Sequence, residues 1–405
     1  MMQLFKMAFR DLGRNRRRSF FSALAVALGL ALLMLMASVI NGEMGSAIES
    51  AIHLQSGHIQ LRMPSYDENK SSLKWEDLVQ NPEQIANQIA ALEPVIAATP
   101  RLFASGFLST GNESAGVRIY GIDPASAANN PYREGVVSGS YLTADDRAGL
   151  LIGNPIADKL HLKAGDQVDL SVNTSNGNVA EQTFTVRGIY TTNTYGFDSG
   201  TIFLPLAKAQ TITQTENHAS TILVLLKDTS FTDSVVAALK GNALRVLTWR
   251  DLNVLFVDFE TMAQSYISIF YLIILAITAS VIINTLIMSV YERTREIGIL
   301  SAIGMRGGRI MALFLAESSL LAVGGVIMGL VLGILATTYF NRFGFYIGNM
   351  GITGMLVSDT IYAKLTVNDT ISLTIMTFVV TLLAGLYPAV MASRMQPVEA
   401  LRAEK

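Results

Sequence analysis

The charged side chains best placed to do chemistry lie in one short segment between two long apolar runs. Residues 291–309 read YERTREIGILSAIGMRGGR. On a helix, residues three apart share a face, so Glu292 can pair with Arg295 and Arg293 can pair with Glu296. Such pairs hold charges in place and transform no substrate. Because the segment is rich in arginine, the positive-inside rule places it on the cytoplasmic side of a membrane.

The same segment also predicts a small apolar stripe. Ile297, Leu300 and Ile303 recur at helical spacing, and Gly304 and the glycine pair 307–308 supply turns toward the next apolar run. An apolar stripe beside a charged rim suits contact with a cytoplasmic protein. The alternative is an ordinary charged loop that only sets membrane topology, and physical reasoning from the residues favours neither.

Other reactive side chains are scarce or unsuitably spaced. The chain has no cysteine, which excludes a disulfide, a thiolate metal site and a cysteine nucleophile. The four histidines show no metal-ligand spacing within a helix, and we interpret His53 and His58 as ordinary surface residues. The sequence contains no G-x-x-x-x-G-K-[ST] motif, so another subunit would have to bind any ATP. A net charge of -2 argues against binding of nucleic acid.

Composition and hydropathy predict a mixed membrane and extracytoplasmic architecture. The chain has 405 residues, of which 50% are hydrophobic and 15% are charged. Four apolar runs are long enough to cross about 30 Å of hydrocarbon; they cover residues 19–40, 267–290, 310–340 and 370–387, the last of them ended by Pro388. The flanking arginines and lysines place both ends of the chain inside. The predicted fold class is therefore a membrane α-helical protein with four transmembrane helices and an extracytoplasmic α+β domain inserted between the first and second spans.

Three domains follow from this pattern. Residues 1–41 form an amphipathic interfacial helix and the first span, because apolar and basic residues alternate at helical spacing before the apolar run. The alternative, the n-region of a cleaved signal peptide, fits less well because the apolar run is too long and no A-x-A-like site closes it. Residues 42–262 form the extracytoplasmic domain. Residues 263–405 hold three spans, the cytoplasmic segment 291–304 and a cytoplasmic tail.

Polar and small residues inside the spans are candidates for function or packing. Gly325, Gly329 and Gly333 repeat every four residues, which predicts close packing against another span. Glu317 either has a functional role inside the membrane, or it reaches the membrane interface or pairs with an arginine of the segment 291–304. Asn284 is either a substrate contact or, as we favour, a helix–helix hydrogen bond.

The motifs resemble a known family of membrane proteins, the FtsX-like permeases of MacB-type and lipoprotein-releasing (LolC/LolE-type) ABC transporters. The family's coupling helix, of the form ERTREIGILRALG, docks on an ATPase; it is matched here by Glu292, Arg293, Thr294, Arg295, Glu296, Ile297, Gly298, Ala302 and Gly304. A tail of the form P-x-E-A-L-R is matched by Pro397, Glu399, Ala400, Leu401 and Arg402. The stretches GIDP, GNPIADKLHLKAGDQVDL, VRGIY and IFLPLAKAQ resemble the family's periplasmic core domain.

The resemblance implies a non-catalytic permease subunit in the cytoplasmic (inner) membrane that transmits motion driven by an ATPase. The expected partners are two copies of an ABC ATPase, which would bind ATP and Mg, a second identical or homologous permease, and membrane lipid. The implied activity is extraction of a lipoprotein or a similar amphiphile. The alternatives are MacB-like export of peptides or small amphiphiles and, in another class, FtsX-like activation of an extracytoplasmic hydrolase.

Two features bear on the substrate. In the lipoprotein-releasing permease that recruits a carrier, a long proline-rich arm occupies the hairpin that corresponds to residues 171–182. Here that hairpin is short, lacks proline and contains the Asn176–Gly177 turn signal, which argues against docking of a carrier there. An apolar cleft between the first two spans would suit acyl chains, and its candidate lining residues are Met34, Met36, Ile267 and Phe270.

Overall fold

The computed structural model describes residues 2–14, 16–67, 72–111, 113–241, 243–346 and 359–395. The chain separates into two compact units, one of residues 1–43, 260–345 and 362–405 and one of residues 44–259 and 346–361. The first unit contains the helices α1 (Met2–Arg14), α2 (Arg16–Ser50), α10 (Val254–Glu292), α11 (Thr294–Ala302), α12 (Gly307–Phe343) and α13 (Val367–Ser393), of which α2 and α10 continue into the second.

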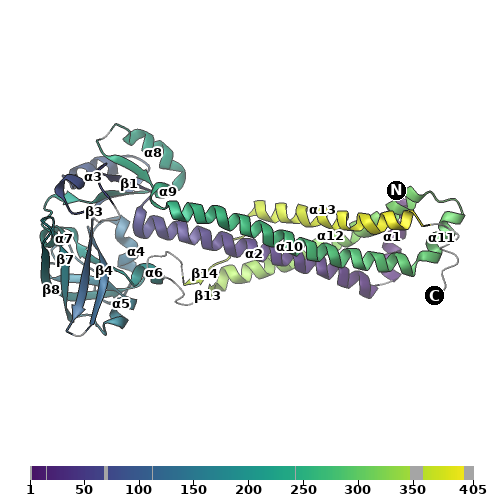
Figure 1. The fold of residues 1–405 in the computed structure, drawn as a ribbon, viewed down its shortest axis with the longest axis horizontal. Helices are drawn as coiled ribbons and strands as arrows, with labels where there is room; N and C mark the ends of the chain where they lie inside the picture. Colours follow the sequence, from purple (N-terminus) through teal and green to yellow (C-terminus); the bar gives the residue numbers. More distant parts are fainter. Residues whose placement is uncertain are drawn as a thin grey trace. The chain divides into compact units, whose positions relative to one another are not determined.

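Four of these helices, α2, α10, α12 and α13, are long and apolar enough to cross a membrane, which confirms the four predicted spans. Figure 1 shows them running side by side. The end predicted for the fourth span was wrong, because α13 continues through Pro388 to Ser393. Proline removes one backbone hydrogen bond, and a membrane helix tolerates this loss where neighbouring helices pack around it. Pro388 is buried together with Ala384, Gly385 and Ala389, so close packing surrounds that point.

Small residues bring α2 and α12 into close contact. A Cβ atom at Gly325 would lie 2.5 Å from Val26 Cβ, one at Gly329 would lie 2.9 Å from Leu30 Cβ, and one at Gly333 would lie 2.6 Å from Met34 Sδ. Both partners advance by four residues in the same direction, so the two helices run parallel. The glycine face of α12 therefore fits against one face of α2, and van der Waals contact replaces side-chain bulk.

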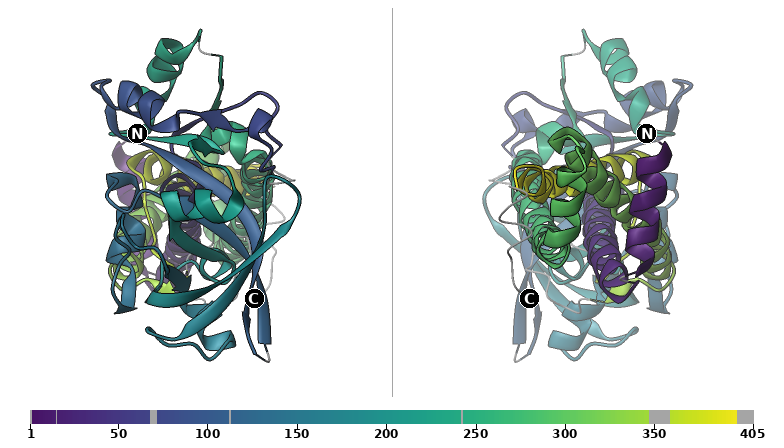
Figure 2. Two further views of the ribbon diagram at one scale, coloured as in Figure 1. Left: turned by 90° about the vertical axis from the view of Figure 1, so that its left-hand side faces the viewer. Right: turned by 90° about the vertical axis from the view of Figure 1, so that its right-hand side faces the viewer.

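Two further close approaches join the remaining spans. A Cβ atom at Gly29 of α2 would lie 2.5 Å from Thr278 Oγ1 of α10, and one at Gly385 of α13 would lie 2.1 Å from Ser318 Oγ of α12. The amphipathic helix α1 crosses the direction of the four long helices (Figures 1 and 2) and buries Ala8 against Leu313 and Ala316 of α12. The membrane unit is thus a bundle whose contacts depend on small side chains.

The second unit is built on a large sheet. Its strands are β1 (Ile59–Arg62), β3 (Val95–Thr110), β4 (Glu113–Ile122), β5 (Val136–Gly139), β6 (Gly149–Gly153), β7 (Gln167–Asn173), β8 (Val179–Tyr190), β9 (Thr201–Pro205), β11 (Thr221–Leu226) and β12 (Arg245–Thr248). The short strands β2 (Val79–Gln80) and β10 (His218–Ala219) pair separately, and β13 (Phe345–Tyr346) and β14 (Thr360–Ile361) form a third small sheet.

Six strands of the large sheet close into a ring. The pairs are β3–β4, β4–β9, β9–β6, β6–β8, β8–β7 and β7–β3. Alternate residues of each strand point inward, and they form one apolar core that includes Leu102, Ile119, Leu170, Phe184 and Ile202. The longest strand, β3, also pairs with β11 and so joins the ring to β11, β1 and β12.

Helices cover the sheet and complete the unit. They are the π-helix η1 (Ala51–Ser56), the 3₁₀ turns η3 (Trp75–Asp77), η4 (Ala127–Asn129) and η5 (Thr229–Phe231), and the α-helices α3 (Pro82–Ala90), α4 (Asn130–Glu134), α5 (Asn154–Lys159), α6 (Tyr195–Asp198), α7 (Leu206–Thr213), α8 (Thr232–Leu239) and α9 (Trp249–Leu252). α3 and α8 enclose a second apolar core against β1 and β11, and the left panel of Figure 2 shows the sheet and these helices together.

Two local predictions for this unit need correction. The apolar residues Leu78, Ile85, Ile89 and Leu92 predict one helix over residues 75–92. No single helix forms there, because Asn81 is left-handed with φ 49° and Pro82 starts a new helix. The hairpin between β7 and β8 has a five-residue loop, residues 174–178, in place of a two-residue turn. Thr174 closes that loop with bonds from its N and Oγ1 to Asn178 O, and Gly177 supplies the positive φ.

A leucine at position 329 tests the glycine contact. Gly329→Leu would drive a side chain into Leu30 and the backbone of Ala27, and we expect a loss of about 1–3 kcal/mol of stability. Gly324→Leu, on the same helix with nothing within 4 Å of its Cβ position, is the matched control. Thermal unfolding of both purified variants, followed by size-exclusion chromatography, measures the difference. Equal midpoints would contradict the close contact.

Candidate functional site

The helix break at Arg293 defines the candidate site. α10 ends at Glu292 and α11 begins at Thr294, so Arg293 is the N-cap residue of α11, with φ -110° and ψ 14°. Thr294 Oγ1 donates to the carbonyl oxygens of Val290 and Tyr291 and ties the new helix to the end of the old one. At its other end, α11 closes with Gly304 at φ 94°, where Gly304 N donates to Ser301 O and Met305 N to Leu300 O. The break turns the Arg293 side chain inward, and only 9% of it is exposed.

Three carboxylates surround the Arg293 guanidinium. Its Nη1 donates to Glu317 Oε1 at 2.5 Å, its Nη2 to Asp11 Oδ2 at 2.7 Å, and its Nε to Glu296 Oε2 at 3.1 Å. The Asp11 and Glu317 side chains are 12% and 3% exposed, so these two pairs are nearly shielded from water. Phe314 places its ring 5.8 Å from the guanidinium carbon. One arginine therefore joins α1, α11 and α12, all within the membrane unit.

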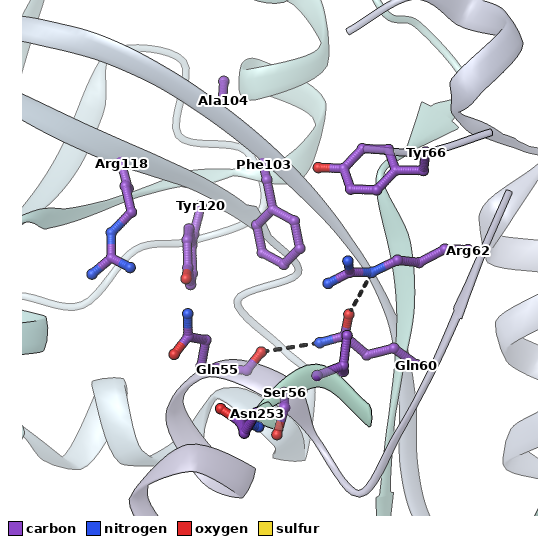
Figure 3. Close-up of a pocket in the computed structure, with 11 residues that line it drawn as sticks. Gln55, Ser56, Gln60, Arg62, Tyr66, Phe103, Ala104, Arg118, Tyr120 and Asn253 are labelled. Carbon is purple, nitrogen blue, oxygen red and sulfur yellow. Dashed lines mark hydrogen bonds between the residues drawn. The ribbon is translucent and has the colours of Figure 1, made fainter. Parts of the chain in front are cut away.

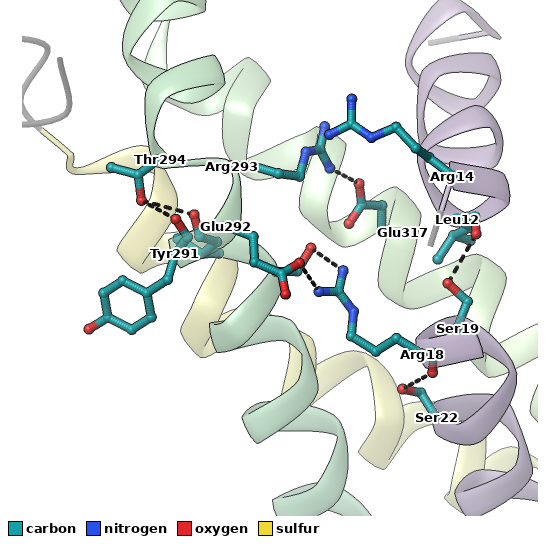
Figure 4. Close-up of polar contacts among 12 residues, drawn as sticks. Leu12, Arg14, Arg18, Ser19, Ser22, Tyr291, Glu292, Arg293, Thr294 and Glu317 are labelled. Atoms are coloured by element: carbon teal, nitrogen blue, oxygen red, sulfur yellow. Dashed lines mark hydrogen bonds and ion pairs between the residues drawn. The ribbon is translucent and has the colours of Figure 1, made fainter. Parts of the chain in front are cut away.

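Two more arginines extend this group toward the surface. Arg14 Nη2 donates to Glu296 Oε1 at 2.7 Å, and both side chains are about half exposed. Arg18 of α2 donates to Glu292 through Nη1 and to Ser289 Oγ through Nη2, the latter at 2.9 Å (Figure 4). We use the name inner charge cluster for the seven charged residues Asp11, Arg14, Arg18, Glu292, Arg293, Glu296 and Glu317. It connects α1, α2, α10, α11 and α12.

Burial decides which of these contacts matters most. Exposed ion pairs contribute about 0–1 kcal/mol, whereas removal of one partner from a buried pair costs about 3–5 kcal/mol because a buried charge is left alone. Burial would lower the pKa of Arg293, but the neighbouring Glu317 and Asp11 carboxylates more than offset burial and raise it. For Glu296, burial acts to raise the pKa, and the bonds from Arg14 and Arg293 outweigh it, so the pKa is lowered. Both shifts favour the charged forms of Arg293 and Glu296.

The structure forms one of the two expected pairs within the segment. Arg293 pairs with Glu296, but Glu292 pairs with Arg18 of α2, and Arg295 is exposed. The reason is the break at residue 293, because residues on either side of it no longer share one helical face. The expected apolar stripe is also divided: Ile297 is buried with Gly298, whereas Ile303 is 80% exposed. Of the other matched positions, Thr294 is half-buried, and Ala302 and Gly304 are exposed.

The ambiguity at Glu317 is resolved in favour of an arginine partner, since it binds Arg293. Sequence reasoning missed Asp11, Arg14 and Arg18, which lie about 280 residues from their partners. One signal was available, because Asp11 is the only acidic residue among the first eighteen. The tail residues Pro397, Glu399, Ala400, Leu401 and Arg402 lie outside the described residues.

The proposed cleft residues differ in burial, and the cleft itself stays a prediction. Met34 is fully buried in the bundle beside Gly333, whereas Phe270 is 51% exposed on α10. Met36 and Ile267 are each half-buried. Asn284 is exposed on α10 and has no hydrogen bond among the residues that the structure describes, so the favoured bond between spans does not form within this chain.

In the part of the chain that the structure describes, no group of three His, Cys, Asp or Glu side chains is placed to hold a metal ion, and the three carboxylates around Arg293 bind the guanidinium. The interpretation of His58 as a surface residue was wrong. It is 5% exposed, its Nδ1 accepts a hydrogen bond from Leu226 N at 3.2 Å, and burial lowers its pKa to about 4. A neutral histidine acts there as a structural acceptor beside β11.

Two family models match the chain. The MacB-like periplasmic core domain matches residues 19–242, and the FtsX-like permease C-terminal domain matches residues 268–397. The chain belongs to the FtsX-like, MacB-type permease family of ABC transporters. The second model spans α11 and three of the cluster's acidic residues, Glu292, Glu296 and Glu317.

Relatives of this FtsX-like permease carry different names. It is 23% identical over 428 aligned positions to the lipoprotein-releasing system transmembrane protein LolC of Neisseria meningitidis, with 98% of each chain covered. It is 25% identical over 420 positions to the macrolide export ATP-binding/permease protein MacB of Marinobacter nauticus, covering 99% of this chain and 61% of MacB. The crystal structure of the periplasmic region of MacB from Actinobacillus actinomycetemcomitans matches with 16% identity and a TM-score of 0.34, covering 53% of this chain and 97% of that structure.

Replacement of Arg293 tests the cluster in this permease. Arg293→Gln leaves Glu317 and Asp11 buried without a cation, and we expect a loss of about 3–5 kcal/mol of stability. Arg295→Gln, an exposed arginine two residues away, should change stability by less than about 0.5 kcal/mol. Adding Glu317→Gln to Arg293→Gln should restore part of the loss. Thermal unfolding of the purified chains measures all three, and indistinguishable midpoints for the two arginine variants would refute the role of the cluster.

Proposed function

We propose that this permease transmits motion from an ABC ATPase across the membrane to its extracytoplasmic unit, without catalysing a reaction itself. ATP and Mg are bound by the partner ATPase, of which two copies serve two permeases. The chain lies in the cytoplasmic (inner) membrane with α11 on the cytoplasmic side. The observation that carries this proposal is the division of α11 into an anchored face and an exposed apolar face.

The exposed face of α11 suits contact with another protein. Ile303 is 80% exposed and Ile299 is 44% exposed, and Tyr291 just before the break is 59% exposed. Exposed apolar side chains on a short helix beside charged residues are a typical interaction surface. We propose that the ATPase docks on Ile299 and Ile303, with Arg295 at the rim.

The opposite face of α11 suits transmission of a push. Ile297 packs with Val290, Ile310 and Phe314, which come from α10 and α12. Arg293 binds Asp11 of α1 and Glu317 of α12, so a displacement of α11 is resisted by buried charges on both helices. The helices α2 and α10 each contribute residues to both units, so each is a continuous helical connection between them.

A second permease has a suitable surface on α10. In the most apolar part of this helix only 17% of residues are buried, against 39% in each of the other three long helices. Its exposed residues include the polar Asn284 among Ile273, Ile277, Val281 and Met288. A side-chain amide that faces lipid lacks hydrogen-bond partners, which is costly, so a second helix is the fitting neighbour. We propose that α10 faces the partner permease.

We propose that the permease extracts a lipoprotein or a similar amphiphile. The support is the similarity to LolC, a lipoprotein-releasing system transmembrane protein, which covers 98% of both chains. MacB-like export of peptides or small amphiphiles is the second candidate, supported by the MacB relative. FtsX-like activation of an extracytoplasmic hydrolase remains an alternative of another class. It predicts that a hydrolase, and no amphiphile, purifies with the complex.

A charged residue on the exposed face of α11 tests the docking proposal. Ile303→Asp should weaken ATPase binding by roughly 30-fold, about 2 kcal/mol, as expected for a central apolar contact. Copurification of the ATPase with the permease, and ATP hydrolysis by the complex, measure the effect. Val137→Asp, at an equally apolar and 58% exposed position in the extracytoplasmic unit, is the control. If the Ile303→Asp permease still copurifies with as much ATPase as the wild type, the ATPase does not dock on this face.

Cysteine cross-linking tests the second permease. The chain has no native cysteine, so Asn284→Cys introduces a single thiol. We expect a cross-linked permease dimer in membranes treated with a short bismaleimide. Ile375→Cys on α13, which is 58% exposed, should give little dimer. If position 375 cross-links and position 284 does not, α13 and not α10 faces the partner.

A further inference from the structure

One outer face of the β3–β4 ribbon carries an unusual combination of residues. The register places Phe103 opposite Tyr120, Ser105 opposite Arg118, and Phe107 opposite Gly116. Directly opposed residues of an antiparallel pair lie on the same face. Their neighbours Leu102, Ala104, Val117 and Ile119 belong to the apolar core of the ring, so this row points away from that core.

Two hollows meet on this face at Arg118. The first, of about 200 Å³, is lined by Phe103, Tyr120 and Arg118, with Gln55, Gln60 and Arg62 around them. Figure 3 shows the guanidinium groups of Arg118 and Arg62 on opposite sides of the two rings. The second hollow, of about 600 Å³, is lined chiefly by small residues, among them Gly106, Gly116 and Ser171, with the exposed side chains of Phe107 and Val179 beside them. Arg118 lines both hollows.

Two arginines on this side of the ribbon, Arg101 and Arg118, have neutral hydrogen-bond partners. Arg118 Nη2 makes a long bond of 3.3 Å to Thr201 Oγ1. Arg101, fully buried behind Tyr120, donates to Asn129 Oδ1, Leu54 O and Tyr132 Oη, all of which are neutral. Within the described residues, neither Arg101 nor Arg118 has a carboxylate within 4.0 Å, and neither hollow is lined by an acidic side chain.

The buried carboxylate on this side of the sheet is engaged elsewhere. Asp198 of α6, two residues before the Gly200 that lines the second hollow, accepts hydrogen bonds from Thr191 Oγ1, Thr192 N and Thr192 Oγ1. Burial raises its pKa to about 6, and these three bonds only partly offset that effect. It therefore carries less negative charge near neutral pH than an exposed aspartate would, and it is not bonded to Arg118.

We propose that this face binds an anionic amphiphile, with the anionic group at Arg118 and the apolar chain in the hollow beside Phe107 and Val179. A charged guanidinium that lacks a carboxylate gains most from an anion, because such hydrogen bonds are the stronger kind. Phe107 and Val179 are 63% and 67% exposed, and an apolar chain would cover them. The site rests on the proposed function in that it names the chemical class of the amphiphile and places a contact in the extracytoplasmic unit.

Binding of short-chain lipids to the intact permease tests the site. The protein is reconstituted in nanodiscs of zwitterionic phosphatidylcholine, and calorimetry measures binding of dihexanoyl phosphatidylglycerol, dihexanoyl phosphatidylcholine and inorganic phosphate. We expect the anionic lipid to bind at least about tenfold more tightly than either of the others, since only it satisfies both halves of the site. Equal binding of the two lipids would overturn the anionic part, and equal binding of free phosphate would overturn the apolar part.

Variants separate the two halves. Arg118→Gln should weaken binding of the anionic lipid by about tenfold or more, and Arg118→Lys should retain most of it because the charge remains. Phe107→Ala should weaken the lipid and leave any weak phosphate binding unchanged. Arg147→Gln, an exposed arginine of the same unit, is the matched control and should bind as the wild type does. A uniform response of all four variants would overturn the site.

The lipid-binding experiment can fail while the proposed function stands, and the reverse also holds. Lipid binding is measured without nucleotide, whereas the Ile303→Asp experiment reads out the ATPase. If the anionic lipid does not bind but Ile303→Asp still weakens ATPase binding, only the lipid site is ruled out. If the anionic lipid binds but Ile303→Asp leaves ATPase binding unchanged, the lipid site stands and the proposed docking of the ATPase is ruled out.

Discussion

The membrane unit depends on one buried guanidinium that three carboxylates share. Arg293 satisfies all its nitrogen positions through Asp11, Glu296 and Glu317, which come from three helices. A buried charge is costly unless it is fully paired, so these helices cannot separate at this end without exposing an uncompensated ion. Hydrogen bonds from Arg293 therefore hold α1, α11 and α12 together at this end. A movement of α11 has to move α1 and α12 with it or break these bonds.

The rest of the membrane unit complements that constraint. Glycines at positions 325, 329 and 333 bring α12 against α2 along residues 325–333, and close packing makes the pair stiff there. At the charged end, Arg18 joins α2 to Glu292 of α10. The exposed Ile299 and Ile303 are thus mounted on a rigid base. Apolar residues lie on both faces of α11: Ile297 holds the helix against α10 and α12, and Ile299 and Ile303 on the other face are exposed.

In the extracytoplasmic unit, a stable apolar core supports an outer surface of mixed character. The six-stranded ring has a continuous apolar core, and its outward residues are free to differ in kind from strand to strand. On the outer face of β3 and β4 they combine two aromatic rings with Arg118, next to the buried Arg101. Burial of a cation without a carboxylate is unfavourable for folding alone, and this is the face at which we propose that an anionic ligand binds.

The sequence alone identified the four long apolar helices, because these follow from local hydropathy. The cytoplasmic placement of residues 291–304 follows from the arginine pattern and stays a prediction. The sequence did not reveal β3, whose run contains Pro100 and several small residues and shows no clean alternation. Only the tertiary structure decided that Glu292 pairs with Arg18 and that Arg293 reaches Asp11 and Glu317. These partners are distant in sequence, and a helix break of one residue, which no local pattern predicted, sets the direction of the side chain that joins them.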